Sequence, residues 1–127
     1  MAVAPKSARI KFLAVTIYHN PRCSKSRATL QLLLDHGIEP HIVEYLKQPP
    51  SAAEIEEILQ ALAMEPRELM RKNEATYKEL ALDNTALTRK QLIAAMRQHP
   101  VLIERPIVRR ARKAAIGRPP ERVLEIL

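Results

Sequence analysis

The chain has 127 residues, of which 46% are hydrophobic and 3% aromatic, a composition typical of one compact domain with an aliphatic core. The formal net charge of +7 favours an anionic partner, and no apolar run approaches the roughly 20 residues that cross a bilayer. One cysteine cannot form an internal disulfide, so we expect a soluble, cytoplasmic protein that forms a single domain over 1–127, with 1–11 as a loose N-terminal leader.

The first half of the chain predicts a β-α-β unit. The apolar and β-branched stretch Phe12–Tyr18 indicates a buried strand. Leucines recur at helical spacing over Ser24–His36, and Gly37 stands where a helix C-cap belongs. His41–Tyr45 indicates a second strand. Because a helix joins the two strands, we expect them to be parallel.

The middle of the chain predicts helices. Ser51–Glu54 and Thr88–Gln91 have the pattern of capping boxes, in which the first side chain accepts from the backbone and the last reaches back. Pro66 occupies a favoured first position of another short helix. These segments together predict a helical insertion.

The end of the chain predicts a hairpin and a closing helix. The two prolines of 99–108 indicate turns around short extended pieces. Residues 107–110 and 114–117 indicate two strands around a basic turn, and 119–127 indicate a helix that begins at Pro119 or Pro120. The whole order predicts an α/β fold with a four-stranded mixed sheet flanked by helices.

The only cysteine, Cys23, lies between a proline turn and the predicted helix. The thiolate is the reactive form of cysteine, and a helix N-terminus and nearby cations both favour it. The flanking groups that could support a thiolate are His19, Arg22, Ser24, Lys25, Ser26 and Arg27. The alternative is a buried apolar cysteine with no chemical role.

Spacing separates two kinds of cysteine chemistry. A cysteine phosphatase loop has five residues between cysteine and arginine, whereas three lie between Cys23 and Arg27. A thioredoxin-type redox pair has a second cysteine at the position that Ser26 occupies here. A redox role for Cys23 therefore requires a thiol from another molecule, either glutathione or a redox protein.

Four motifs are found in order: "IYHNPRCSKSRATLQLL", "ELMRKNE", "HPVLIERPIV" and "IGRPPERVLEIL". With these motifs the chain resembles the ArsC family of glutaredoxin-coupled arsenate reductases from about Val15 to its C-terminus. The resemblance implies a thioredoxin-like fold. It also implies that the cysteine attacks arsenate, that glutathione attacks the adduct and releases arsenite, and that glutaredoxin reduces the mixed disulfide.

The resemblance also implies the site. The positions of the nucleophile and of the arginines that handle the oxyanion are Cys23, Arg71, Arg105 and Arg118. His19 and Ser26 match residues near the sulfur, and Arg27 adds a cation. Pro106 is implied to follow a cis peptide bond. Guanidinium groups suit this role because they bind tetrahedral oxyanions in pairs of hydrogen bonds. Glutathione is implied as co-substrate, with no bound cofactor.

The chain departs from the best-known family members, which have Cys-Gly-Thr-Ser-Arg where this chain has Cys-Ser-Lys-Ser-Arg. The influence of Ser24 and Lys25 on substrate choice stays open, as do the electron donor and the oligomeric state. Two alternatives are a glutathione mixed-disulfide oxidoreductase and a regulatory module whose basic turn at 109–113 binds an acidic protein. Scarce aromatic residues argue against nucleic-acid binding, and the four histidines lack metal-ligand spacing.

Overall fold

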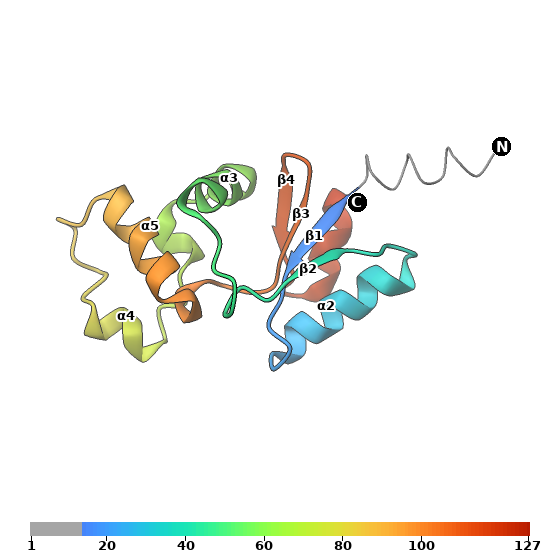
Figure 1. The fold of residues 1–127 in the computed structure, drawn as a ribbon, viewed down its shortest axis with the longest axis horizontal. Helices are drawn as coiled ribbons and strands as arrows, with labels where there is room; N and C mark the ends of the chain where they lie inside the picture. The colour runs from blue at the N-terminus through green and yellow to red at the C-terminus, as the bar shows by residue number, and fades with distance from the viewer. Residues whose placement is uncertain (1–13) are drawn as a thin grey trace.

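The structure is a computed structural model that describes residues 14–127, and its centre is a four-stranded sheet (Figure 1). In chain order the strands are β1 (Val15–Tyr18), β2 (His41–Val43), β3 (Ile107–Arg110) and β4 (Lys113–Ile116). Their order in the sheet is β2-β1-β3-β4, with β1 parallel to β2 and the other pairs antiparallel. The predicted mixed sheet and the parallel first pair are confirmed. The predicted leader at 1–11 lies outside the described residues.

The first two strands are shorter than predicted. β1 begins at Val15 rather than Phe12, and positions 12–13 lie outside the described residues. β2 ends at Val43 because the chain turns immediately afterwards: the carbonyl of Glu44 accepts from the amides of Lys47 and Gln48, each at 2.9 Å. Tyr45 therefore leaves the predicted strand, and its side chain is buried in the same apolar cluster as Tyr18 and Ile107.

The sheet is buried on both faces because its side chains alternate. Ile17 and Val108 belong to one apolar cluster, while the adjacent residues Tyr18 and Ile107 belong to a second. Two helical segments cover the first face, α2 (Ser24–Asp35) and the 3₁₀ helix η3 (Pro120–Ile126). α3 (Ala52–Leu62) packs over the second face (Figure 1). The predicted closing helix is thus present from Pro120, with 3₁₀ rather than α geometry.

α2 begins and ends as the sequence predicts. Its last turn closes at Gly37, which has φ +75° and whose amide donates to Leu34 at 2.9 Å, while Ile38 donates to Leu33 at 3.0 Å. This is the hydrogen-bond pattern of a glycine C-cap. The chain turns here at the C-terminus of α2 and continues to β2, while Cys23 lies at the N-terminus of the helix.

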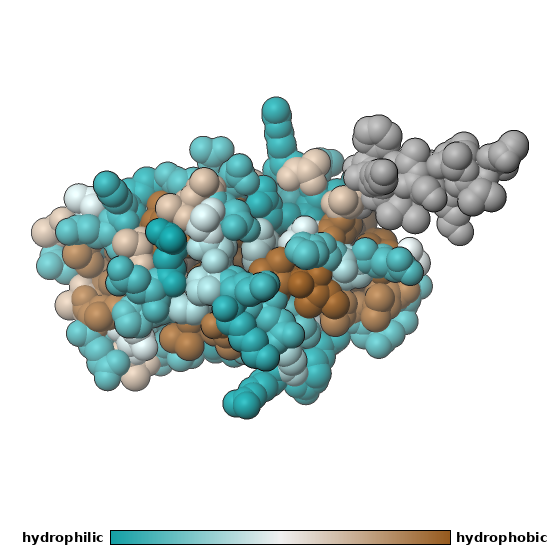
Figure 2. All heavy atoms as spheres, viewed as in Figure 1, coloured by the Kyte–Doolittle hydropathy of each residue, from teal (hydrophilic) through white to brown (hydrophobic). Residues whose placement is uncertain are grey.

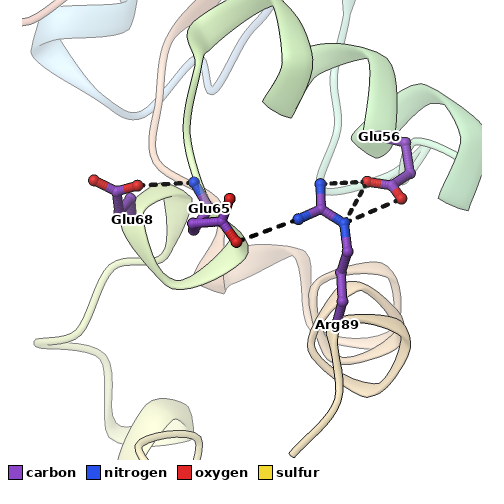
Figure 3. Close-up of polar contacts among 4 residues, drawn as sticks. All are labelled: Glu56, Glu65, Glu68 and Arg89. Carbon is purple, nitrogen blue, oxygen red and sulfur yellow. Dashed lines mark hydrogen bonds and ion pairs between the residues drawn. The ribbon is translucent and has the colours of Figure 1, made fainter.

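The insertion between β2 and β3 is helical, as predicted. Besides α3 it contains η1 (Pro66–Leu69), α4 (Ala75–Glu79), α5 (Arg89–Gln98) and η2 (Pro100–Leu102). Both predicted capping boxes are formed, at Ser51 with Glu54 and at Thr88 with Gln91. Arg89 joins the helices, since its guanidinium lies 2.6 Å from Glu56 of α3 and 3.5 Å from Glu65 before η1 (Figure 3).

The basic hairpin turn is partly used within the fold. Arg109 pairs with Glu57 of α3 at 3.2 Å, and Arg110 donates to the carbonyl of Ile126 at 3.2 Å. Ala111 makes the tight turn with φ +54°. Two of the four basic residues that were considered as a partner-binding turn therefore hold the β3–β4 hairpin against α3 and η3.

The face drawn in Figure 2 is mainly hydrophilic, with hydrophobic side chains gathered over β2 and the end of α2. Leu34 and Ile42 are among the exposed large hydrophobic residues of these elements. Within residues 14–127, each helix is too short or too polar to cross a membrane.

We expect Gly117→Ala to destabilise the fold by about 1–3 kcal/mol, the usual cost of overpacking. Gly117 is buried directly after β4. A Cβ there would lie 2.9 Å from Cγ of Pro106 and 3.1 Å from Cγ2 of Thr29, and closer still to Oγ1 of Thr29. Thermal or urea unfolding measures the loss. Thr29→Ala removes two of the three atoms that a Cβ at position 117 would approach. The double variant should therefore lose less stability than the two single variants lose together. A wild-type midpoint for Gly117→Ala would contradict the packing described here.

Candidate active site

Cys23 is the N-cap residue of α2, with extended backbone angles of φ −94° and ψ 124°. Its carbonyl accepts from the amide of Arg27 at 2.9 Å, and its amide donates to the carbonyl of Asn20 at 3.0 Å. The side chain is 8% exposed. The sulfur therefore lies at the N-terminus of a helix of 12 residues, where unpaired amides and the helix dipole favour a negative charge. The predicted helix start at Ser24 is confirmed.

Ser26 and His19 form a buried pair beside the cysteine. Oγ of Ser26 lies 2.6 Å from Nδ1 of His19 and accepts from the amide of Asn20 at 3.0 Å. Both side chains are buried. Ser26 thus ties α2 to the turn before it, and its hydroxyl is used to fix His19 rather than to bond the sulfur. The histidine ring is in turn held close to the start of the helix.

The imidazole of His19 has a pKa below its ordinary value, mainly because burial disfavours the charged ring, with Arg27 adding to the effect and Glu44 opposing it. A lowered pKa means that the folded protein binds fewer protons than the unfolded chain. Stability contributed by neutral His19 is therefore complete above the unfolded value of about 6.5 and is lost as the pH falls below it.

We expect His19→Gln to weaken the acid dependence of unfolding. Glutamine stays neutral, so the difference in unfolding midpoint between wild type and variant should shrink as the pH is lowered from 7.5 to about 5. Midpoints measured across this range check the sign. His41→Gln, on the exposed edge of β2, is the matched control and should follow the wild-type curve. A difference that grows with acidity would contradict the lowered pKa of His19.

The side chain of Arg27, a nearby cation in the sequence, is directed to the turn before α2. Its Nη1 donates to the carbonyl of Pro21 at 3.0 Å. The guanidinium therefore braces the turn that leads into α2, and its positive charge acts on His19.

The arginine at the sulfur is Arg118, in the turn after β4. Its Nη2 lies 3.8 Å from Sγ of Cys23. Its Nε donates to the carbonyl of Arg105 at 2.8 Å and lies 3.2 Å from Oε1 of Glu104. One edge of the guanidinium is thus held by the backbone and a carboxylate, while the other edge faces the sulfur.

Arg71 reaches the same place because two distant segments pair through their backbones. The amide of Arg71 donates to Leu102 at 2.7 Å, and the amide of Glu104 donates to Leu69 at 2.8 Å. The side chain of Arg71 lies 3.0 Å from Glu74 and 3.7 Å from Glu104. A cavity of about 370 Å³ opens there, and it is lined by Met70, Arg71, Lys72, Asn73, Glu104 and Arg118. Two of the three arginines that were predicted therefore share one cavity.

The third arginine, Arg105, contributes differently. Its carbonyl holds Arg118, as described above. Its Nε is buried and, within residues 14–127, finds no hydrogen-bond partner. A buried donor without an acceptor costs about 1–3 kcal/mol. The Arg105–Pro106 peptide bond has the cis form that the resemblance implies, and the bond between Arg118 and Pro119 is also cis.

Two residues of this region were missed by sequence reasoning. Glu104 contacts two of the three arginines, and the only local signal was its place next to Arg105. Tyr45 is 2% exposed. Burial raises the pKa of Tyr45, and the charges of Cys23 and Glu104 raise it further while that of Arg71 lowers it. The phenol of Tyr45 therefore stays protonated. The sequence places Tyr45 in a predicted strand, so it was not considered as a site residue.

Chemically, the arrangement places the guanidinium of Arg118 between the thiol at the start of α2 and a cavity that Arg71 also lines. It suits a reaction in which a sulfur nucleophile approaches an oxyanion, because the cations offset the repulsion between two negative groups. Among residues 14–127, histidine, cysteine, aspartate and glutamate form no group of three that could hold a metal ion.

Comparison with known proteins gives consistent matches. The model of the ArsC family matches residues 18–126. "Uncharacterized protein YfgD" of Escherichia coli (strain K12) is 55% identical over 89% of this chain and 96% of its own. An "Arsenate reductase" of Haemophilus influenzae is 50% identical over 91% of this chain and 100% of its own. The solved "Arsenate reductase from Vibrio cholerae" is 52% identical with a TM-score of 0.88, covering 91% of this chain and 98% of that one. The predicted thioredoxin-like α/β fold is thereby confirmed.

Proposed function

The chain belongs to the ArsC family, and from this premise we propose that it is an arsenate reductase in which Cys23 is the nucleophile and glutathione with glutaredoxin supplies the electrons. The observation that carries the proposal is the position of Arg118. Its guanidinium lies 3.8 Å from the sulfur of Cys23 and also lines the cavity that Arg71 enters. An oxyanion bound there would lie beside two cations, one of which, Arg118, also faces the sulfur.

The first step of the proposed reaction joins sulfur to arsenic. The thiolate of Cys23 attacks the arsenic of arsenate, and one arsenate oxygen leaves as water after protonation. Arg71 and Arg118 bind the remaining oxygens and stabilise the charge that develops on them. Both arginines line the same cavity of about 370 Å³, so one bound oxyanion can contact both.

The second step needs an external thiol, because the chain has a single cysteine. The sulfur of glutathione attacks the sulfur of Cys23, and the sulfur–arsenic bond breaks with its electron pair left on arsenic. Arsenic gains two electrons and leaves as arsenite, while the two thiols become a mixed disulfide. Glutaredoxin then restores the thiol of Cys23 by thiol–disulfide exchange.

The test is the amount of arsenite that the purified full chain forms from arsenate. With glutathione and glutaredoxin we expect continuous turnover. Without glutaredoxin we expect arsenite to stop at about one equivalent per chain, because the mixed disulfide accumulates. Without glutathione we expect none.

A parallel assay with a glutathione mixed disulfide as substrate separates the alternative of a mixed-disulfide oxidoreductase, for which one reactive cysteine would also be sufficient. A chain that reduces a glutathione mixed disulfide but forms no arsenite would replace the present proposal with that one. Arsenite formation that needs no thiol donor would contradict the single-cysteine mechanism.

A further inference from the structure

Glu104 is a carboxylate placed inside a cluster of cations, an arrangement that opposes the binding of an anion. A single oxygen, Oε1, lies 3.2 Å from Nε of Arg118 and 3.7 Å from Nε of Arg71, and it accepts from the amide of Arg105 at 3.1 Å. The side chain is 28% exposed and lines the same cavity as the two arginines. A negative charge in a site for a negative substrate requires a compensating benefit.

The contacts of Glu104 indicate what that benefit is. The carboxylate lies at the Nε edge of both guanidinium groups. Nη1 of Arg71 pairs with Glu74 at 3.0 Å, whereas the terminal nitrogens of Arg118 face away from Glu104. For Arg118 those nitrogens include Nη2, 3.8 Å from the sulfur of Cys23. Guanidinium groups have five donors in a rigid fork, so fixing the Nε edge fixes the direction of all the others.

Glu104 is itself held rigidly. Its amide donates to the carbonyl of Leu69, two residues before Arg71, at 2.8 Å. The next residue, Arg105, supplies the carbonyl that accepts from Nε of Arg118 at 2.8 Å. One dipeptide therefore presents both oxygens that hold Arg118, and it is joined by its backbone to the segment that carries Arg71.

We propose that Glu104 is a positioning residue, whose carboxylate orients Arg71 and Arg118 toward the oxyanion and the sulfur of Cys23 at the expense of anion affinity. The proposal rests on the proposed function for its role in arsenate reduction. The orientation of Arg118 at the sulfur does not depend on the identity of the substrate.

Two substitutions separate the effect of the negative charge of Glu104 from the effect of its side-chain length. Glu104→Gln keeps the length of the side chain and removes its charge. We expect KM for arsenate to fall about three- to tenfold, because a repulsive charge is gone, and kcat to fall about tenfold or more, because the guanidinium groups lose their fixed direction. Glu104→Asp keeps the negative charge but, with a side chain one methylene shorter, moves the carboxylate away from the two guanidinium groups. We therefore expect kcat to fall without a fall in KM. If Glu104 had a purely structural role, Glu104→Gln would not lower both KM and kcat while Glu104→Asp lowers kcat alone.

Alkylation of Cys23 gives a second readout that needs no arsenate. The rate with anionic iodoacetate divided by the rate with neutral iodoacetamide reports the local potential at the sulfur. We expect Glu104→Gln to raise this ratio about three- to tenfold and Glu104→Asp to leave it nearly unchanged. Glu79→Gln, an identical change on the exposed end of α4, should match the wild type.

The outcomes distinguish the two proposals. If the wild type forms no arsenite but the alkylation ratio changes as expected, the proposed function fails and the placement of Glu104 stands. If Glu104→Gln leaves both kcat and the alkylation ratio at wild-type values, the positioning role is wrong. The same holds if the Gln and Asp variants behave alike in KM and in the ratio, because charge would then not matter.

Discussion

Cys23→Ser should reduce arsenate-dependent arsenite formation by at least about a thousandfold, to the level of a reaction without protein. A serine hydroxyl is a far weaker nucleophile than a thiolate, and the chain contains no other cysteine to replace it. Arsenite measured in the presence of glutathione and glutaredoxin checks the prediction.

The loss in this variant should be chemical rather than structural. The side chain of Cys23 makes no capping hydrogen bond to α2, whereas serine is a favoured N-cap residue. The unfolding midpoint of Cys23→Ser should therefore equal or exceed that of the wild type. Arsenite turnover retained within tenfold in a well-folded variant would mean that another group attacks arsenate.

Arg118→Ala should lower kcat for arsenate by about 10²- to 10³-fold, the usual effect of removing one donor to a developing oxyanion. The guanidinium lies 3.8 Å from the sulfur of Cys23 and shares a cavity with Arg71, so its loss affects both the thiolate and the oxyanion. Steady-state kinetics with saturating glutathione measure the effect.

Arg118→Lys tests whether the positive charge alone is sufficient or whether the shape of the guanidinium group is also required. Arg118 donates from Nε to the carbonyl of Arg105 while Nη2 faces the sulfur, and a single ammonium group cannot do both. Arg118→Lys should therefore recover only part of the lost kcat. Arg112→Ala removes an equal charge from the exposed hairpin turn and should keep wild-type kinetics. Turnover of Arg118→Ala within twofold of wild type would contradict the role of this residue.

Local signals located most of the fold. The capping boxes at Ser51 and Thr88 gave the starts of α3 and α5, and Gly37 gave the end of α2. These features depend on residues within one turn of each other, which is why the sequence contains them. The 3₁₀ geometry of η3 and the early end of β2 at Val43 depend on packing and turns that no local pattern specifies.

Only part of the candidate site could be predicted from the sequence, namely the position of the cysteine and of the arginines along the chain. The place of Cys23 at a helix start follows from its neighbours, and the arginine positions came from the family resemblance. Side-chain directions did not follow: Ser26 turns to His19, and Arg27 turns to Pro21. Glu104 enters the site through backbone pairing between segments more than 30 residues apart, at Leu69 and Leu102. Such long-range pairing leaves no periodic trace in the sequence.

The most direct test of the account is the mass of the intact chain after reaction with arsenate and glutathione in the absence of glutaredoxin. The account predicts that one glutathione becomes attached to Cys23, that this requires arsenate, and that about one equivalent of arsenite appears with it. A chain that gains no glutathione while arsenite is formed would contradict the account. So would an adduct that forms at the same rate without arsenate.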